Sequence, residues 1–268
     1  GFGLAGFGLS TLIFGFTVAG RSFLPGAWPY VLMLVGALAC AAYIVHARRI
    51  AHPILDLSLL RVPTFRTSIL GGGFFRLGMG AVPFMLPLML QVGFGLDPLQ
   101  SGMITFASAF GALLMKTTAG PILRRFGFRN VLTANAVICG GVLALYGMLT
   151  ASVPHVLIIA FLVMAGFFRS LQFTSLNAVA YADIDRPMMS RATAMVAVAQ
   201  QLFLSAGVAI AALLLEASRD MRGAQNLVAG DFSFAFFAIA GLTLGAAILH
   251  SRLAPDAGST VSGHKPRS

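Results

Sequence analysis

Charged residues are scarce in this sequence. Only 10% of its 268 residues are Asp, Glu, Lys or Arg, whereas 58% are hydrophobic, and the mean hydropathy is +0.89. Soluble domains carry about 25% charged residues, because their surface must face water. The composition therefore excludes an ordinary soluble domain and favours the lipid bilayer as the surroundings of this chain.

Residues that carry catalysis or bind metals are also few. The two cysteines, Cys40 and Cys139, both lie inside apolar segments, which indicates neither a disulfide framework nor a zinc site. The sequence has no phosphate-binding Gly-Lys-Ser/Thr loop, metal-ligand cluster or nucleophile motif. We therefore expect no cofactor, no metal and no enzymatic activity, which argues against an ATP-driven pump or an intramembrane hydrolase.

Acidic residues are outnumbered by basic ones. The net charge is +10 and the sequence pI is about 11.0. A nucleic-acid-binding surface would gather these residues into one patch or stripe. Here they punctuate the ends of apolar segments instead, so we expect no nucleic acid among the partners.

Long apolar runs fill the rest of the chain. A membrane-spanning helix needs about 20 mostly apolar residues, and runs of this length without strand-like alternation indicate helices rather than a barrel. We predict an all-α integral membrane fold with eight transmembrane helices. The eight runs are 1–20, 28–46, 65–94, 100–118, 131–151, 155–180, 192–216 and 231–251.

The basic residues also predict an orientation, because Lys and Arg are retained on the cytoplasmic side of a membrane. One set of connections holds thirteen of them and the opposite set holds three. We therefore expect both ends of the chain in the cytoplasm. The thirteen are Arg48, Arg49, Arg61, Arg66, Lys116, Arg124, Arg125, Arg129, Arg186, Arg191, Arg252, Lys265 and Arg267; the three are Arg21, Arg219 and Arg222.

Four regions follow from this pattern. Residues 1–46 hold two helices, and residues 47–64 form a cytoplasmic linker that lies along the membrane interface. Residues 65–251 hold six helices, and residues 252–268 form a polar tail that we expect to be disordered. Six helices divide into two sets of three with opposite orientation, which permits an inverted repeat.

Several stretches resemble the 14-helix drug:proton antiporter branch of the major facilitator superfamily. Residues 52–61 (HPILDLSLLR) are similar to the linker that enters the C-terminal domain of that family. Residues 75–91 (FRLGMGAVPFMLPLMLQ) and 166–177 (GFFRSLQFTSLN) are similar to two of its helices. The pair Gln200 and Gln201, followed by residues 205–209, completes the resemblance in the right order.

The resemblance implies a function and a missing part. The first two helices would be the extra pair that this branch inserts between its two six-helix halves, and the last six would be the C-terminal half. The whole protein would export small amphipathic organic compounds from a bacterium, across its inner membrane, by proton antiport and alternating access. Its N-terminal six-helix half, with the usual coupling acids, would be missing here; the chain starts with Gly rather than Met.

Residues 120–129 (GPILRRFGFR) look like the cytoplasmic loop motif of the superfamily. Arg124 stands where the family usually has an acid, so the usual charge-relay gate is in doubt at this loop. The residues carried over are Gly120, Arg124, Arg125, Gly127 and Arg129. The arginines have two interpretations, because they can hold helix ends or lipid phosphate or simply set the topology.

Two arginines fall within the apolar runs, Arg76 and Arg169. A central arginine costs about 2.5–3.5 kcal/mol on insertion scales, so it faces protein or water. Each is either a buried tie between helices or a cation in a solute cavity, and each has a possible acidic partner in the missing half. The candidate cavity residues are Arg76, Gln91, Arg169, Gln172, Asn177, Gln200 and Gln201, although interhelical hydrogen bonding is an equally simple role for the amides.

Other features leave alternatives open. Residues 71–73 are three glycines, and Pro83 and Pro87 follow in the same run, which predicts either a gate or a static bend. None of the eight acids lies near the centre of a predicted span. His155 and His250 lie at span edges, where interfacial anchoring is the simple interpretation. A non-transporting membrane scaffold or assembly subunit remains the alternative function.

Overall fold

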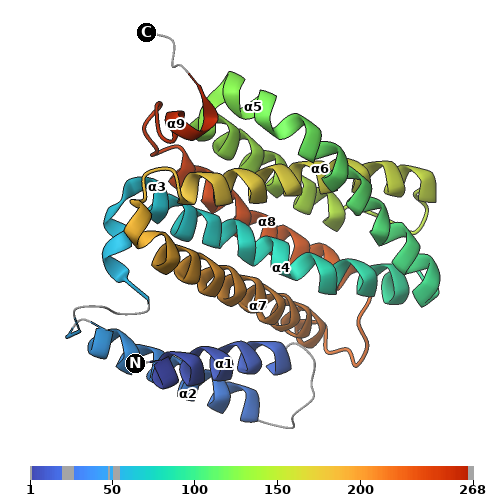
Figure 1. Cartoon of the computed structure of the whole chain (residues 1–268). Coiled ribbons are helices and arrows are strands. Elements are labelled where there is room, and N and C mark those ends of the chain that lie inside the picture. Colours follow the sequence, from blue (N-terminus) through green and yellow to red (C-terminus); the bar gives the residue numbers. More distant parts are fainter. Residues whose placement is uncertain (1, 20–26, 48, 51–54, 265–268) are drawn as a thin grey trace.

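The computed structural model describes residues 2–19, 27–47, 49–50 and 55–264, and the regular elements of that part are all helical. The chain forms one helical bundle, with the α1–α2 pair lying along one side of it (Figure 1). The elements are α1 (Phe2–Ala19), α2 (Trp28–Ala47), η1 (Leu57–Arg61), α3 (Pro63–Arg66), η2 (Thr67–Gly71), α4 (Gly72–Leu88), η3 (Met89–Gly93), α5 (Pro98–Gly147), α6 (His155–Ala180), η4 (Arg186–Met188), α7 (Met189–Met221), α8 (Ala229–His250) and α9 (Ser259–Ser262).

The 50-residue element α5 contains two of the predicted spans. Gly127 has a φ of 73° and a ψ of 164° inside it, so the helix is broken at this residue. Positive φ is readily available only to glycine, which explains the break. The chain reverses there, beside α9 (Figure 1). The two arms of α5, residues 98–126 and 128–147, form a hairpin of helices.

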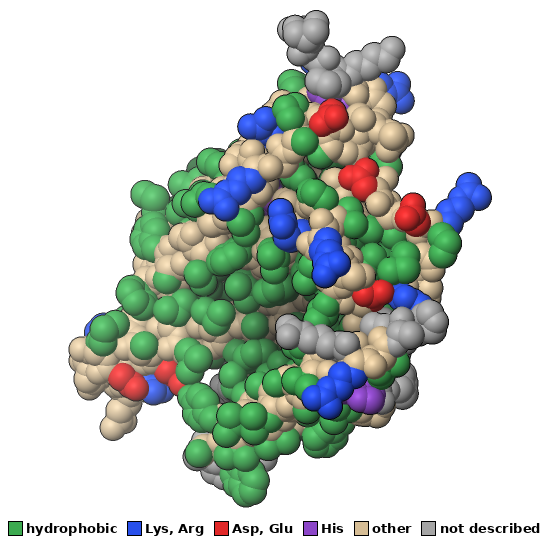
Figure 2. Space-filling view, turned by 90° about the vertical axis from the view of Figure 1, so that its left-hand side faces the viewer, with side chains coloured by type: hydrophobic (Ala, Val, Ile, Leu, Met, Phe, Trp, Pro, Cys, Tyr) green, Lys and Arg blue, Asp and Glu red, His purple; other side chains and the backbone are tan. Residues whose placement is uncertain are grey.

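The helices have the length and surface that a membrane requires. Six helical segments of the described chain are long and apolar enough to cross a bilayer, and α1 is a shorter apolar helix. With α5 divided at Gly127, these segments account for the eight predicted runs. Large hydrophobic side chains are exposed along the flanks, while Lys and Arg dot the end of the bundle that faces the viewer in Figure 2. The protein is an all-α, multi-pass membrane protein.

Two pairs of glycines bring helices into backbone contact. Between α4 and α7, a Cβ on Gly80 would strike the carbonyl oxygen of Leu204, and one on Gly207 would strike that of Leu77. Between the first arm of α5 and α6, Gly111 lies in the same way against Val163, and Gly166 against Ser108. Only glycine permits such close approach.

These contacts repeat in register. A shift of 86 residues carries Leu77 and Gly80 of α4 onto Val163 and Gly166 of α6, and a shift of 96 carries residues 108 and 111 of α5 onto residues 204 and 207 of α7. Both the glycines and the carbonyls that they touch coincide. The first two helices of each predicted triplet therefore correspond, α4 to α6 and the first arm of α5 to α7, in agreement with the 3+3 prediction; the second arm of α5 and α8 complete the two triplets.

The three consecutive glycines serve packing in three directions. A Cβ on Gly71 would meet the His250 ring of α8, one on Gly72 would meet the Arg76 side chain, and one on Gly73 would meet the ring of Phe203 in α7. The helical segment from Pro63 to Gly93 runs through them without a break, with π-helical turns at η2 and η3. In this structure the glycines are points of close packing, and the gate or static bend expected of this run stays a prediction.

Linker and tail are only partly as expected. Within the predicted linker, η1 is a short 3-10 helix whose N-cap, Asp56, accepts a hydrogen bond from the Ser58 amide; residues 48 and 51–54 lie outside the described residues. The tail was expected to be disordered, but residues 252–264 fold against the bundle. Leu253 is buried, Gly258 lies against Phe128, and α9 contacts α5. A few apolar side chains thus hold a segment that looks polar on average.

Candidate functional site

Arg169 lies on α6 beside the close contact between α5 and α6. Its guanidinium donates to the hydroxyl of Ser108 at 3.5 Å, and the side chain is only partly buried. A cavity of about 20 Å³ lies next to it, lined by Ser108, Cys139, Tyr146 and apolar residues of α4 and α6. That volume is enough for about one water molecule. Arg169 is therefore a membrane-depth cation with room for a small polar contact.

Arg76 has a different environment, because its side chain is fully buried inside the bundle. One guanidinium nitrogen donates to the carbonyl oxygen of Ser68 at 2.9 Å, while Nε and the other terminal nitrogen have no hydrogen-bond partner. None of the ion pairs in the described part of the chain includes this residue. It is thus enclosed by the helices of the described chain.

Gln172 joins three helices in the same region. Its side-chain oxygen accepts from Asn135 Nδ2 at 2.9 Å, its nitrogen donates to the carbonyl oxygen of Leu132 at 3.1 Å, and the same nitrogen lies 3.4 Å from His250 Nδ1. Asn135 also donates to the Phe168 carbonyl. We call Ser68, Arg76, Asn135, Gln172 and His250 the buried polar cluster. It ties α5, α6 and α8 together, beside η2 and α4.

The structure corrects the interpretation of His250. A position at the edge of a span favoured interfacial anchoring, but the His250 side chain is fully buried. The Gly71 backbone lies close enough that only a glycine leaves space for the ring. The candidate residues predicted from the sequence do not include Asn135. Its signal was present, because a polar side chain inside an apolar run of a membrane protein usually finds a partner on another helix.

Gln91 lies in a separate groove between α4 and α7. The groove has a volume of about 380 Å³ and is lined by Gly80, Pro83, Phe84, Pro87, Leu88, Gln91 and Val208. Pro87 cannot donate a backbone hydrogen bond, and its carbonyl oxygen accepts from the hydroxyl of Ser101 on α5 at 3.2 Å. Gln91 is therefore the amide side chain of an otherwise apolar groove.

The remaining amides lie apart from Arg169. Gln200 is half-buried on α7, and the neighbouring Gln201 is exposed, with its nitrogen 3.3 Å from the hydroxyl of Ser205. Asn177 is exposed near the end of α6. The seven candidates thus form no single site in the described chain. Arg76 and Gln172 belong to the buried polar cluster. The other five lie at four separate places: Arg169, Gln91, Asn177, and the adjacent Gln200 and Gln201.

The loop motif lies at the break in α5. Gly127 is enclosed by the His264 ring, whose Nδ1 lies 3.0 Å from the Arg124 carbonyl oxygen. The Arg125 guanidinium lies over the ring of Phe126 at 5.4 Å. Arg124 and Arg125 are exposed, Arg129 is half-buried, and Gly120 is exposed with open space around it. The structure therefore gives Gly127 a clear role, since it allows the turn and the contact with the tail.

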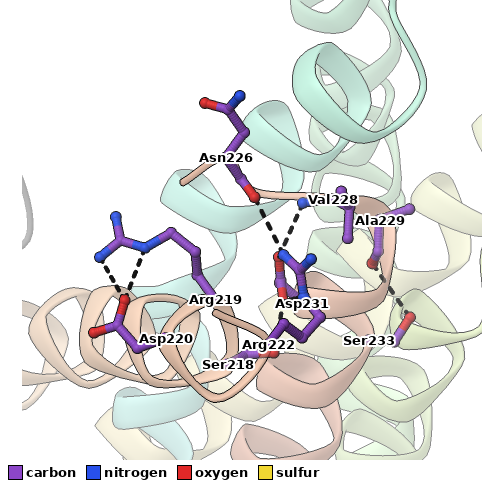
Figure 3. A network of polar contacts seen from close by, with 9 residues as sticks. All are labelled: Ser218, Arg219, Asp220, Arg222, Asn226, Val228, Ala229, Asp231 and Ser233. Atoms are coloured by element: carbon purple, nitrogen blue, oxygen red, sulfur yellow. Dashed lines mark hydrogen bonds and ion pairs between the residues drawn. The ribbon is translucent and has the colours of Figure 1, made fainter. Parts of the chain in front are cut away.

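The acids lie at helix ends, as expected. Asp231 is fully buried at the start of α8 and accepts from Ser218 Oγ at 2.7 Å, from the Val228 amide at 2.9 Å and from Arg222 Nε at 2.9 Å (Figure 3). Asp231 in turn raises the pKa of Arg222, chiefly by accepting its hydrogen bonds. This network fastens the end of α7 to the start of α8. At the other end of the bundle, Asp56 pairs with Arg191 at 3.2 Å and Asp183 accepts from Thr64.

Comparison with known proteins gives a consistent result. The chain is 30% identical to the probable transport protein HsrA of Haemophilus influenzae over 88% of its own length and 51% of that protein. It is 30% identical to the putative multidrug resistance protein MdtD of Klebsiella pneumoniae over 90% of its length and 52% of that protein. The MdtD of Pectobacterium atrosepticum is 31% identical over 69% of the chain.

The chain spans about half the length of the first two relatives and 40% of the third. Residues 68–268 match the sequence profile of the Major Facilitator Superfamily, which includes every helix from α4 to α9. That segment also contains both triplets and the helix contacts that relate them. From its helices, its repeat and this match, we conclude that the chain belongs to the Major Facilitator Superfamily.

Proposed function

We propose that the chain is the C-terminal portion of a secondary transporter that exports amphipathic organic compounds by proton antiport. Its family and its relatives, two of them named as putative multidrug resistance proteins, support this proposal. The export cycle would be alternating access, in which two six-helix halves rock around a shared central cavity. The relatives are about twice as long as this chain. In a protein of that length, the other six-helix half would lie N-terminal to this segment.

The position of Arg169 carries the proposal within this chain. The Arg169 side chain is only partly buried near the middle of α6, and its guanidinium donates a hydrogen bond to the hydroxyl of Ser108. A cation at such depth is costly unless it faces water, a solute or an acid. We assign it to the wall of the central cavity, where it either contacts the solute or pairs with an acid of the N-terminal half.

The coupling acid would belong to that same N-terminal half. The described carboxylates lie near helix ends, and Asp231 and Asp56 are already paired with arginines. A carboxylate held by a fixed cation is a poor proton carrier, because the cation favours its charged form. The C-terminal portion would then supply cavity walls and packing, with the proton site opposite.

The protein would lie in the bacterial inner membrane with both ends of this chain in the cytoplasm. Arg66 and Arg252 line one groove, and Arg124 lies beside the tail at the same end of the bundle as Thr64 and Asp183. The gathering of these basic connections supports that orientation.

Substitution of Arg169 tests the proposal in the complete protein. Arg169→Lys keeps the charge but loses the planar five-donor fork, and Arg169→Ala also leaves any acidic partner unpaired. We expect efflux of a fluorescent amphipathic dye from energised vesicles to fall in both variants, and further in Arg169→Ala, at equal membrane abundance.

Thr117→Ala is the matched control, because Thr117 is exposed, is not among the candidate cavity residues and donates to the Leu114 carbonyl within its own helix. Normal efflux by Arg169→Ala at equal abundance would show that Arg169 has no role in transport. That result would favour the alternative of a non-transporting scaffold. If Arg169→Ala fails to accumulate while Thr117→Ala accumulates, Arg169 is a structural tie instead.

A further inference from the structure

A second groove lies where the segment from α3 to η2 meets the end of α8. It has a volume of about 350 Å³, and its walls include Pro63, Arg66, Thr67, Leu70, Leu249 and Arg252. Gly71 forms part of the groove; a Cβ there would meet Leu249 and the His250 ring. The absence of that side chain brings the two helix ends together beneath the groove. This groove shares no lining residue with the cavity beside Arg169 or the groove at Gln91.

Two cations share this groove without a counterion. Arg66 and Arg252 are exposed, and neither side chain takes part in the hydrogen bonds or ion pairs of the described residues; only their backbone amides donate, to Val62 and Leu249. No acid is among the lining residues. Two guanidinium groups that face one groove repel each other, and an anion placed between them relieves this repulsion. Guanidinium also matches phosphate oxygens in a bidentate geometry.

Apart from Thr67 and Gly71, the remaining walls are apolar. Leu70 is 44% exposed, and Pro63 is exposed as well. A water-soluble anion gains nothing from such walls, whereas the glycerol backbone and acyl chains of a phospholipid do. The groove also lies at the end of two membrane-spanning segments, where headgroups reside. The pairing of charge with apolar surface therefore distinguishes a lipid from free phosphate.

We propose that this groove binds an anionic phospholipid, with its phosphate between Arg66 and Arg252 and its acyl chains against Leu70 and Leu249. The hydroxyl of Thr67 offers a further hydrogen-bond donor within the same walls. This binding would anchor the start of the α4 segment to the end of α8, and it does not depend on the proposed transport activity.

Native mass spectrometry of the purified protein tests the proposal, with phosphatidylglycerol and phosphatidylcholine as probes. We expect phosphatidylglycerol to bind in preference, and each of Arg66→Gln and Arg252→Gln to weaken that binding about fivefold, because a juxtamembrane arginine contributes about that factor. The double variant should lose the preference. Arg186→Gln is the control, because it removes an exposed arginine outside this groove; this variant should keep the preference for phosphatidylglycerol.

Two further arms keep the result decisive. Arg66→Lys with Arg252→Lys retains both charges and should retain most of the preference, which separates loss of charge from loss of fold. Inorganic phosphate and glycerol phosphate should not compete with phosphatidylglycerol at equal concentration. Equal binding of both lipids, an unchanged preference in the double Gln variant, or full competition by inorganic phosphate would each overturn the proposal.

Discussion

Arg76 illustrates how a membrane protein tolerates a buried cation. The guanidinium has one backbone acceptor, the carbonyl of Ser68, and two nitrogens without a partner. Insertion scales place the cost of such a residue at about 2.5–3.5 kcal/mol. The buried His250 ring packs against Gly71 of the same helical segment, and such polar groups offset part of that cost.

Gln172 is the member of the buried polar cluster whose loss we expect to be most damaging. Gln172→Leu leaves the Leu132 carbonyl and the His250 ring without their side-chain neighbour. An unsatisfied buried polar group costs about 1–3 kcal/mol, so the protein should denature at a distinctly lower temperature in detergent. Gln201→Leu serves as the comparison, because an exposed substitution usually changes stability by less than about 0.5 kcal/mol. Equal denaturation temperatures for the two variants would contradict this role.

Asp56 gives a pH dependence outside the membrane. Hydrogen bonds from Ser58, and the Arg191 charge, hold the pKa of this carboxyl below its ordinary value of 3.8. The stabilisation is therefore complete above about pH 4 and is lost as the pH falls through the lower folded-state pKa. Asp56→Asn should lower the denaturation temperature at pH 7. The difference in denaturation temperature between this variant and the unmodified protein should become smaller at the lowest pH at which both are still folded. A difference that widens with acid would show the opposite sign.

For the arginines within the apolar runs, the sequence predicts depth in the membrane but not the direction of the side chain. The depth of Arg76 and Arg169 in their runs was predictable from length and apolarity. The side of the helix that each faces was not, because a run that is apolar all round gives no amphipathic signal. Gln172 and Arg169 lie three residues apart on α6, yet one is buried and the other partly exposed.

At the scale of elements, the glycine contacts place two helix pairs at backbone distance. Gly111→Ala puts a methyl group into the Val163 carbonyl and should destabilise the protein by about 1–3 kcal/mol. Gly141→Ala, on the second arm of the same helix, has open space around its Cβ and should stabilise by up to about 1 kcal/mol through helix propensity. Chemical denaturation of the two variants in detergent measures these opposite signs, and a stabilising Gly111→Ala would rule out the tight contact.

The number and order of the helices could be predicted from the sequence, because about 20 apolar residues between charged connections leave few alternatives. The sequence predicts a turn in the basic connection between the runs 100–118 and 131–151, but it does not predict that the turn lies at Gly127. The fold of the tail could not be predicted, since its contacts are long-range: Gly258 lies against Phe128, and His264 against Gly127. Composition averages over such contacts and indicates disorder.

At the scale of the whole molecule, the proposed orientation has a direct test. In a background without Cys40 and Cys139, single cysteines at Arg61, Arg125 and Arg186 should resist a membrane-impermeant maleimide in intact cells and react after the cells are opened. Cysteines at Asp97 and Asp220 should react in intact cells. Labelling of the Arg125 position from outside would reverse the assignment, whereas the helix packing would stand.

The backbone character of the glycine contacts also limits how the protein can evolve. At Gly80, Gly111, Gly166 and Gly207 the opposing atom is a main-chain carbonyl oxygen, which every amino acid carries. A side-chain replacement on the facing helix therefore makes no room for a bulkier residue at any of the four. In a genetic selection that starts from an inactive Gly111→Leu allele, we expect only codon reversions to glycine, with no compensating second-site alleles on α6.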